Sequence, residues 1–447
     1  MTRSDVDVVV VGARCAGAPL ATFLARSGAR VLLLDRSPLP SDQVLSTHTI
    51  HPPGVDVLDE LGVGDAVRDV APHTRRLRLV RGDQPADVEL APGRMELCPR
   101  RQRLDGLLQE AAVEAGAELR DRTRVTEVLF EDGRAVGVRT RSDGGTGEIR
   151  AGLVVGADGR HSTVAEEVGA EEYLAYDAPR AMYWGYWDAP EDWRSERYPF
   201  DMYLAHRDEH LRAIFPTDHD QLLIGSMPPV EEGRSWSEDP LGRLRESLGA
   251  DPVTGPLVRD ADPDGKIRGT VKERFFFRRG AGPGWALVGD AGHHKDYVVG
   301  DGITEALLQA KSLARAVEEG TDAALERWWR ARDVEALPQY FWGKEEGAPG
   351  GPGVLEPLVA RAIASDPDLR RRMTGLLEHR CSPYDVIPAR VALRCAAGAL
   401  VRGRVQVVPE VVGQVRATLR YERELEARER LLGEVEERAA ERRPAAR

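Results

Sequence analysis

Short apolar runs alternate with stretches of helical periodicity along the first part of the chain. The run VDVVVV at 6–11 is mostly β-branched and predicts a strand buried on both faces. Residues 15–27 carry apolar side chains at helical spacing, and Gly28 behind them predicts the end of that helix. A second apolar run at 30–34 predicts another strand. This strand–helix–strand order is typical of an α/β fold with a parallel sheet.

The pattern changes in the middle of the chain. From about 178 to 271, aromatic and alternating segments such as MYWGYW at 182–187 are broken by polar turns, which predicts a mainly antiparallel sheet. The α/β pattern returns with a strand at 285–288 and a helix at 302–318. After the glycine-rich break GAPGGPG at 347–353, the tail is predicted to be largely helical and to end in a charge-dense segment.

Composition and charge restrict the function. The chain has 447 residues, enough for about two or three domains, and its 42% hydrophobic and 30% charged content is typical of a soluble globular protein. The net charge of −12 argues against a nucleic-acid or anionic-membrane partner. Scattered cysteines without a CxxC pair predict no metal site and a reducing compartment. With no signal peptide and no membrane-spanning apolar run, we expect a cytoplasmic protein.

A glycine-containing loop follows the first predicted strand. The string GARCAG at 12–17 keeps the first and third glycines of a dinucleotide-binding loop and has Arg14 in the middle position. Such glycines permit a tight turn and bring a pyrophosphate to the N-terminus of the following helix. Asp35 ends the second predicted strand, where a carboxylate binds a ribose hydroxyl. Strand, loop, helix and acid in this order predict a nucleotide site.

Two further segments place an aspartate at a strand end. The string LVVGADGRHSTVAEEVG at 153–169 leads from a strand into the turn Asp158-Gly159. The string GWALVGDAGHHKDYVVGDGITEALLQAKSLA at 284–314 carries Asp290 after a strand and then a helix that begins near Gly302. The N–H groups of that helix would favour an anionic group in front of them. Neither motif is specific by itself, because Asp-Gly is also common turn chemistry.

Together, the three motifs over residues 5–335 resemble the p-hydroxybenzoate hydroxylase-like family, the group A flavoprotein monooxygenases. The strings GARCAGAPLA, STH at 46–48 and GDAGHHKD resemble one branch of NAD(P)/FAD-dependent oxidoreductases within it. The resemblance implies an α/β fold: a glutathione-reductase-type, Rossmann-like FAD domain with an inserted, mainly antiparallel substrate domain and a helical C-terminal region. The expected boundaries are 1–75, 98–175 and 271–345 for the FAD domain, 76–97 and 176–270 for the substrate domain, and 346–447 for the C-terminal region.

The family's cofactor contacts can be carried over to this chain position by position. The resemblance implies that the first loop faces the FAD pyrophosphate and that Asp35 lies at the adenosine ribose. It also implies that Gly302 lies under the flavin ring, and that His48 and Thr49 fall beside the flavin N5/O4 edge. The FAD-binding residues implied in this way are Gly12, Arg14, Ala16, Gly17, Asp35, Arg36, Thr49, Arg101, Val125, Asp158, Gly159, Gly289, Asp290, Gly302 and Ile303.

The resemblance also suggests which residues lie at the reacting side of the flavin. His48 and Tyr297 are the candidate catalytic residues, and flavin contact is the alternative role for His48. The HHK cluster at 293–295 is expected to be structural or to touch the flavin edge, since the oxygen chemistry belongs to the flavin. Only some of the aromatic residues along alternating strands can face one pocket. The candidate substrate-binding residues are Trp184, Tyr186, Tyr203 and Phe276.

The sequence departs from the family pattern at Arg14, Ala165 and Tyr297-Val298. We still expect FAD binding, but two reactions remain possible. In the first reaction, NAD(P)H reduces the flavin, O2 forms a flavin C4a-hydroperoxide, and a small organic substrate is hydroxylated or epoxidised. We expect that substrate to be an aromatic or polyketide-like secondary metabolite. The alternative is a reductase of the geranylgeranyl reductase type, acting on a carbon–carbon bond without O2. A halogenase is disfavoured, because no lysine precedes Lys266 and MYWGYW does not match that family's WxWxIP segment.

The electron donor and the oligomeric state are less constrained. The sequence holds no second glycine-rich strand–loop–helix for a nicotinamide nucleotide. NAD(P)H is therefore expected to bind transiently, or a partner flavin reductase to supply the electrons. A scaffold in which the flavin is only structural is a further alternative. A homodimer contact through the last helix is also open.

Overall fold

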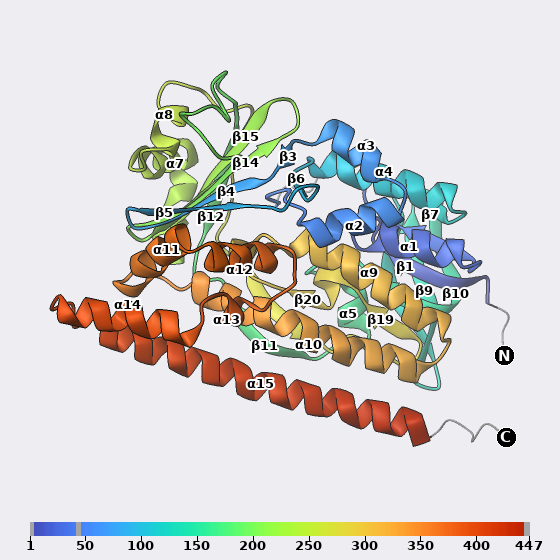
Figure 1. Cartoon of the computed structure of the whole chain (residues 1–447). Helices are drawn as coiled ribbons and strands as arrows, with labels where there is room; N and C mark the ends of the chain where they lie inside the picture. The colour runs from blue at the N-terminus through green and yellow to red at the C-terminus, as the bar shows by residue number, and fades with distance from the viewer. Residues whose placement is uncertain (1–3, 42–45, 442–447) are drawn as a thin grey trace.

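A mainly parallel sheet, on the right in Figure 1, carries the predicted nucleotide loop. The computed structural model describes residues 4–41 and 46–441. The strands of this sheet and its attached ribbon are β1 (Val6–Val11), β2 (Val31–Leu34), β7 (Glu118–Arg120), β8 (Arg124–Glu131), β9 (Arg134–Ser142), β10 (Gly145–Gly156), β18 (Ala281–Gly282) and β19 (Trp285–Leu287). Their order is β18-β19-β10-β1-β2-β7; β9 pairs with the first part of β10, and β8 pairs with β9. The predicted first strand thus lies between two parallel neighbours.

Helices cover one face of this sheet and a β-ribbon covers the other. The helices in this part of the chain are α1 (Gly17–Arg26), α2 (Pro52–Glu60), α3 (Gly64–Val70), α4 (Arg101–Glu114), α5 (Thr163–Glu167), α9 (Gly302–Glu318) and α10 (Asp322–Glu346). Val8 and Val10 belong to the core beneath α1, α4 and α9, whereas Val9 and Val11 pack with α5 and the β8–β9 ribbon. Successive side chains of β1 point to opposite faces of the sheet, and both faces are buried. A strand in this position therefore needs an apolar residue at every position, which the valine run supplies.

A second, seven-stranded sheet is built from two segments far apart in the sequence. Its strands are β4 (Arg76–Arg81), β5 (Gln84–Glu89), β12 (Met182–Asp188), β13 (Met202–Arg207), β14 (His210–Thr217), β15 (Gln221–Met227) and β16 (Arg268–Thr270). All neighbouring strands are antiparallel except β13 and β4, which confirms the predicted mainly antiparallel sheet. The helices α6 (Val230–Ser235), α7 (Pro240–Gly249) and α8 (Thr254–Val258) lie toward the end of this part of the chain.

The two faces of the seven-stranded sheet have different cores. Met182, Trp184 and Tyr186 project to one face, which also contacts Tyr297, the residue that begins the turn before α9. Tyr203 projects to the opposite face, together with the apolar side chains of α7 and α8. Two small sheets join these parts: β3 (His73–Thr74) with β6 (Glu96–Leu97), and β11 (Glu172–Asp177) with β17 (Arg274–Arg278) and β20 (His293–His294).

The C-terminal region forms a helical layer beneath both sheets (Figure 1). Its helices are α11 (Leu355–Ser365), α12 (Pro367–Leu377), α13 (Pro383–Val386), α14 (Ala389–Val401) and α15 (Val407–Glu441). Helix α11 packs against β4 and β5, and the long helix α15 runs beside α10. Within the described ranges, the structure has no helix that is both long enough and apolar enough to cross a membrane.

Candidate functional site

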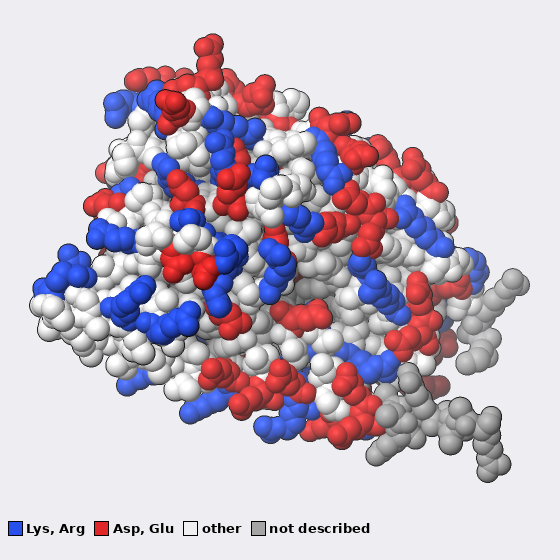
Figure 2. Space-filling view, in the orientation of Figure 1, with Lys and Arg blue, Asp and Glu red and all other residues white. Residues whose placement is uncertain are grey.

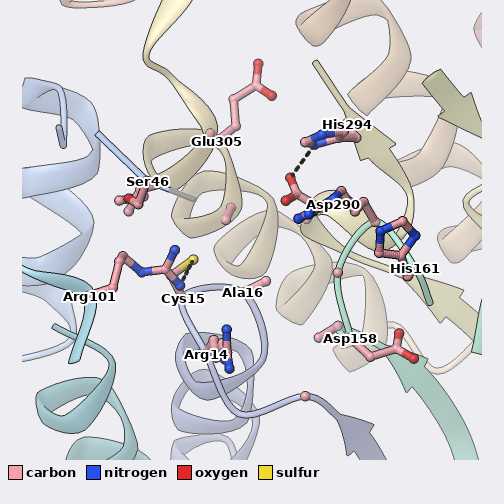
Figure 3. A pocket seen from close by; sticks show the side chains of 18 of the residues that line it. Arg14, Cys15, Ala16, Ser46, Arg101, Asp158, His161, Asp290, His294 and Glu305 are labelled. Atoms are coloured by element: carbon pink, nitrogen blue, oxygen red, sulfur yellow. Dashed lines mark hydrogen bonds and ion pairs between the residues drawn. The ribbon is translucent and has the colours of Figure 1, made fainter. Parts of the chain in front are cut away.

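A cavity of about 390 Å3 lies at the carboxyl ends of β1, β2, β10 and β19, where the three predicted motifs meet (Figure 3). Of the FAD-binding residues implied by the resemblance, Gly17 alone is set back from it, behind the first loop. The others line the cavity: Gly12, Arg14, Ala16, Asp35, Arg36, Thr49, Arg101, Val125, Asp158, Gly159, Gly289, Asp290, Gly302 and Ile303. Residues from distant parts of the chain thus converge on one site.

The two glycines of the first loop are required by close backbone packing. Gly12 has a φ of +105°, and a Cβ added there would lie 2.3 Å from the Ala157 carbonyl oxygen. A Cβ at Gly17 would lie 1.9 Å from the Gly12 carbonyl oxygen. Any side chain at either position would push the loop away from the end of β10. The loop therefore has the tight, backbone-lined form that a pyrophosphate requires.

Asp35 fixes the loop to the end of β2. One carboxylate oxygen accepts a hydrogen bond from the Ala13 N–H at 3.0 Å, and the other accepts one from the Ser37 N–H at 2.8 Å. Arg14, in the middle position of the loop, donates to the Ser41 hydroxyl at 3.1 Å and lines the cavity. The arginine thus brings a positive charge to the place where dinucleotide loops usually have a glycine.

Arg101 brings a second positive charge to the cavity from the start of α4 (Figure 3). It is buried, and its guanidinium donates to both oxygens of Asp105, at 3.0 and 3.1 Å, and to the Cys15 sulfur at 3.3 Å. Burial raises the pKa of the Cys15 thiol to about 11, more than the nearby Arg101 lowers it. Cys15 therefore stays a neutral thiol at ordinary pH, and the arginine keeps its charge for an anionic ligand.

The two aspartates that follow strands β10 and β19 have different environments. Asp158 accepts hydrogen bonds from the Ser162 hydroxyl at 2.5 Å and the Thr163 N–H at 2.8 Å, so its carboxylate caps the start of α5. The Asp290 side chain is 42% exposed and faces His294, whose Nδ1 lies 3.4 Å away (Figure 3). Asp290 is therefore the aspartate whose carboxylate is open to a ligand in the cavity.

His294 is held as a cation beside Asp290. Burial disfavours the charged imidazole, but Asp290 and Glu273 outweigh that effect and raise the pKa of His294 to about 9. Burial by itself would raise the pKa of the Asp290 carboxyl, but the nearby cations, His294 foremost, outweigh it and the pKa is lowered overall. Glu273 in turn forms an ion pair with Arg160, whose Nε lies 2.9 Å from a carboxylate oxygen. This part of the cavity is thus a network of paired charges at neutral pH.

Two helices begin at the cavity without a side-chain cap. Helix α1 starts after Ala16 and α9 starts after Asp301, and the side chain of neither residue accepts a hydrogen bond from the first turn of its helix. In α1 the Ala18 N–H already donates to a backbone carbonyl and Pro19 has no N–H, so the Gly17 N–H is the one left for another acceptor. In α9 no described side chain takes the first N–H groups. Because the N-terminus of a helix carries a partial positive charge, both helix starts suit an anionic ligand. One cavity with two uncapped helices is the arrangement that FAD, with a pyrophosphate and a polar flavin edge, would fit.

Asp301 fails to cap α9 because its carboxylate is used elsewhere. It accepts from Lys295 Nζ at 2.8 Å and from His379 Nε2 at 3.0 Å, and Lys295 also pairs with Glu305. The opposite charges keep the pKa of Lys295 above its ordinary value despite burial. His379 belongs to the loop after α12, so the C-terminal layer contributes to this buried cluster. Sequence reasoning missed His379, since no motif surrounds it.

Two glutamines that were not predicted hold the loops in place. Gln109 of α4 donates to the Ala13 carbonyl at 2.7 Å, and the Gln309 carbonyl oxygen of α9 accepts from the Gly289 N–H at 3.1 Å. Each satisfies a buried backbone group in a loop that has no sheet partner. One glutamine on a helix forms no recognisable sequence motif, so the sequence did not predict either contact.

The predicted catalytic residue His48 lies behind the cavity wall. It is buried with a φ of +67°, and its Nε2 hydrogen-bonds the Tyr186 hydroxyl at 2.7 Å. Burial, together with the charges of Arg101 and Arg100, lowers the pKa of His48 to about 3, so the imidazole is neutral. Its neighbours Thr47 and Thr49 line the cavity, whereas His48 itself does not.

The second predicted catalytic residue, Tyr297, does line the cavity. Its hydroxyl donates to the Arg180 carbonyl at 2.6 Å, and burial raises its pKa well above the ordinary value. The Arg180 guanidinium in turn donates to backbone carbonyls, among them Ala348 at 2.8 Å. Tyr297 therefore presents its ring to the cavity and its hydroxyl to the protein.

The predicted substrate-binding aromatic residues are not brought together. Trp184 and Tyr186 lie on the sheet face that contacts Tyr297, next to Met182, which lines the cavity. Tyr203 lies on the other face, where its hydroxyl donates to Asp251 at 2.8 Å. Phe276 lies on β17, with the Arg278 guanidinium stacked over its ring at 4.0 Å.

Comparison with known families gives the class of this protein. The family model described as "FAD binding domain" matches residues 5–326. The chain therefore belongs to the FAD-binding domain family, and it is an FAD-dependent oxidoreductase with the expected α/β fold. The FAD family expected from the sequence is thereby confirmed.

Individual relatives differ in the reactions that their names state. Digeranylgeranylglycerophospholipid reductase 1 of Methanopyrus kandleri is 26% identical over 389 residues, which are 84% of this chain and 98% of that protein. The 12-dehydrotetracycline 5-monooxygenase/anhydrotetracycline 6-monooxygenase of Streptomyces rimosus is 34% identical over 167 residues, which are 37% of this chain and 33% of that protein. The solved complex of aklavinone-11 hydroxylase with FAD and aklavinone has a TM-score of 0.65 and 24% identity, covering 76% of this chain and 68% of that chain. That structural likeness shows a shared fold.

Proposed function

We propose that this protein is an FAD-dependent monooxygenase that hydroxylates or epoxidises a small, largely apolar organic molecule. The observation that carries the proposal is the chemistry of the wall formed by the seven-stranded sheet and Tyr297. His48 is neutral there, and the Tyr297 hydroxyl is already donated to a carbonyl. The cations His294 and Lys295 of the cavity lining are held in ion pairs with carboxylates. Reduction of a carbon–carbon double bond requires a proton at one carbon for each hydride delivered, so it needs a free acid beside the substrate. Transfer of an electrophilic oxygen to an electron-rich carbon does not.

The lining residues define how FAD would be held. Arg14 and the N-terminus of α1 would face the pyrophosphate, and Asp35 the adenosine ribose. Asp290 would accept hydrogen bonds from hydroxyl groups of the cofactor, and the N-terminus of α9 would face the polar edge of the flavin. The remaining contacts would come from Gly12, Ala16, Arg36, Thr49, Arg101, Val125, Asp158, Gly159, Gly289, Gly302 and Ile303, with Gly17 supporting the loop.

Bound FAD supplies the redox chemistry, accepting a hydride and passing electrons to O2. The protein's own part is to hold a substrate against the flavin and to exclude water. The Tyr297 ring and the Met182 side chain form the apolar wall for that substrate. Trp184 and Tyr186, behind Met182, would set the width of this wall, and His48 would fix the Tyr186 hydroxyl. NAD(P)H, or a separate flavin reductase, would act as the electron donor.

Isotope labelling tests the proposal directly. The purified, FAD-loaded protein would be given NADPH or NADH and a panel of polycyclic aromatic polyketides under 18O2, and products would be analysed by mass spectrometry. We expect 18O in the product and no product without O2. Product formed under strict anaerobiosis, or product free of label, would contradict monooxygenation.

One observation favours a second candidate. Relatives named as digeranylgeranylglycerophospholipid reductases match most of this chain and of their own length, whereas the monooxygenase relative matches only part. A flavin-dependent reductase acting on the carbon–carbon double bonds of a polyprenyl lipid is therefore the alternative. The same experiment with a geranylgeranyl lipid and a chemical reductant separates the two, because the reductase would saturate the lipid without O2.

A further inference from the structure

The hairpin of α14 and α15 carries an apolar surface that nothing in the described structure covers. We call it the hairpin patch; its side chains are between 42% and 89% exposed. It consists of Leu393, Leu400, Val401, Val405, Val408, Val412, Val415 and Leu419. These are eight of the ten large apolar side chains that are exposed among the described residues, so the exposure is concentrated in one place. Such concentration marks an interaction surface rather than chance.

The patch is not a by-product of packing the hairpin. The inner side of the hairpin is a separate core, in which Ala396, Ala399 and Val407 pack against Leu355 of α11. Val408, Val412, Val415 and Leu419 follow the spacing 4, 3 and 4 along α15, which places them on one face of the helix. Helix α15 therefore has two apolar stripes in its first half: one holds the fold, and the other faces outward.

The charges around the patch are of one sign. Residues 386–421 contain six arginines and a single acidic residue, Glu410. The Glu410 carboxylate is engaged, because it accepts the backbone N–H groups of Val354 at 2.9 Å and Leu355 at 2.8 Å. Within the described part of the chain, no ion pair engages the exposed arginines Arg390, Arg394, Arg402 and Arg404. Four unpaired cations beside an apolar surface favour an anionic partner.

The shape of the surface shows what kind of partner fits. The turn at 402–406 joins α14 to α15 at one extremity of the molecule, on the left in Figure 1. Val401 and Val405 on either side of this turn are 89% and 64% exposed, and Arg402 and Arg404 lie between them. In Figure 2, this end is a white surface with blue side chains near it, and red ones gather farther along α15. Protruding apolar side chains with adjacent cations suit insertion into a bilayer interface, whereas a protein helix docks into a groove.

A second copy of this chain fits the patch poorly. A two-fold contact centred on the hairpin patch would bring this surface of both chains together and place its arginines near their own copies. The second half of α15 reverses the charge: residues 422–441 contain eight glutamates and four arginines. An anionic surface would therefore attract the hairpin end and repel the rest of the helix.

We propose that the hairpin patch docks this protein onto the surface of an anionic lipid bilayer. The apolar side chains at 401, 405 and 408 enter the interface, and the arginines at 390, 394, 402 and 404 contact lipid headgroups. The net charge of −12 argues against an anionic membrane only for the chain as a whole. Adsorption depends on the local charge within about a Debye length of the membrane, and the hairpin end is locally positive. No helix crosses the bilayer in this arrangement.

Vesicle binding by the full-length, FAD-loaded protein tests the proposal. Co-sedimentation would be measured with vesicles of phosphatidylcholine mixed with phosphatidylglycerol, and with vesicles of phosphatidylcholine alone, at low and high salt. We expect binding to the anionic vesicles that weakens with salt, and little binding to the neutral ones. One arginine near an anionic surface strengthens binding about fivefold. Arg402→Glu with Arg404→Glu should therefore weaken it more than about tenfold, and Val401→Asp with Val405→Asp should do the same.

Matched controls separate a local effect from a general one. Val113 is 50% exposed on α4, and Arg103 is an exposed arginine of the same helix, away from the hairpin. Val113→Asp and Arg103→Glu should bind the anionic vesicles like the parent, and FAD content and circular dichroism would verify folding of every variant. No binding by the parent, or equal binding by all variants, would overturn the proposal. A dimer in light scattering that the Val401→Asp and Val405→Asp pair converts to a monomer would assign the patch to a second copy instead.

Discussion

The cofactor cavity and the hairpin of α14 and α15 use arginine in opposite ways. In the cavity, Arg101 is buried and its position is fixed by both oxygens of Asp105. In the hairpin, Arg402 and Arg404 are exposed and have no carboxylate partner among the described residues. Buried charges must be paired, because desolvation is costly, and pairing fixes their geometry. Exposed, unpaired charges cost little and stay available, so the first region is built for precise orientation and the second for recognition of a surface.

The largest expected effect comes from removing the cation of the buried cluster. Lys295→Met removes the cation that the buried carboxylates of Asp301 and Glu305 share and leaves each of them with a histidine alone, which should cost about 3 to 5 kcal/mol in the free energy of unfolding. Arg402→Met removes an exposed charge and should change stability by less than about 0.5 kcal/mol. Urea unfolding of both variants measures the difference. Similar losses for the two would show that the contrast between the regions is wrong.

Two glycine substitutions compare how tightly the backbone is packed in the cofactor loop and in the hairpin. Gly17→Ala places a methyl group 1.9 Å from the Gly12 carbonyl oxygen, so the loop must move. A cost of about 3 kcal/mol would lower FAD affinity by about a hundredfold. Gly413 on α15 has no atom within 4 Å of its added Cβ, and Gly413→Ala should stabilise the helix by up to about 1 kcal/mol. Flavin fluorescence titration gives the first quantity and thermal unfolding the second; tight FAD binding by Gly17→Ala would refute the packing argument.

The paired charge of His294 should make stability depend on pH. Its pKa is about 9 in the folded chain and near 6.5 when unfolded, so its stabilisation is complete below pH 6.5. It is lost as the pH rises through 9, because the folded state then gives up a proton that it held more tightly than the unfolded state. The contribution is about 3 kcal/mol. His294→Gln should remove the fall in stability between pH 6.5 and 9, and an unchanged pH profile would show that His294 is not a cation.

The smallest effect is expected for the arginine of the first loop. Arg14 would donate charge-assisted hydrogen bonds to the cofactor pyrophosphate, each contributing about 1.5 kcal/mol. Arg14→Gly should therefore weaken FAD binding about tenfold, and more at low salt than at high salt. Arg14→Lys should retain part of the affinity, and Arg402→Gly in the hairpin should retain all of it. Parent-like binding by Arg14→Gly at both salt concentrations would leave Arg14 without a role at the phosphate.

The sequence predicted those features that arise within one strand–loop–helix unit. The positions of Gly12 and Asp35 at one cavity were predictable because a strand, a tight turn and a helix return the chain to the same sheet edge. The two faces of β1 were predictable for the same reason, since a valine run is needed only where both sides of a strand are buried. The order of three such motifs then led to the FAD family, whose model match covers residues 5–326.

Features that join distant segments were decided only by the tertiary structure. His379 meets Asp301 because α12 packs against β5 and the loop that follows α12 reaches the start of α9. No local sequence pattern around residue 379 predicts that contact. Tyr203 and Trp184 look alike in sequence, but strand register sends them to opposite faces of the sheet. Helix α15 shows two apolar stripes, and only the position of α11 decides which one is covered and which one, with its unpaired arginines, faces outward. Burial depends on what else is folded nearby, and that information lies in the packing of the whole chain.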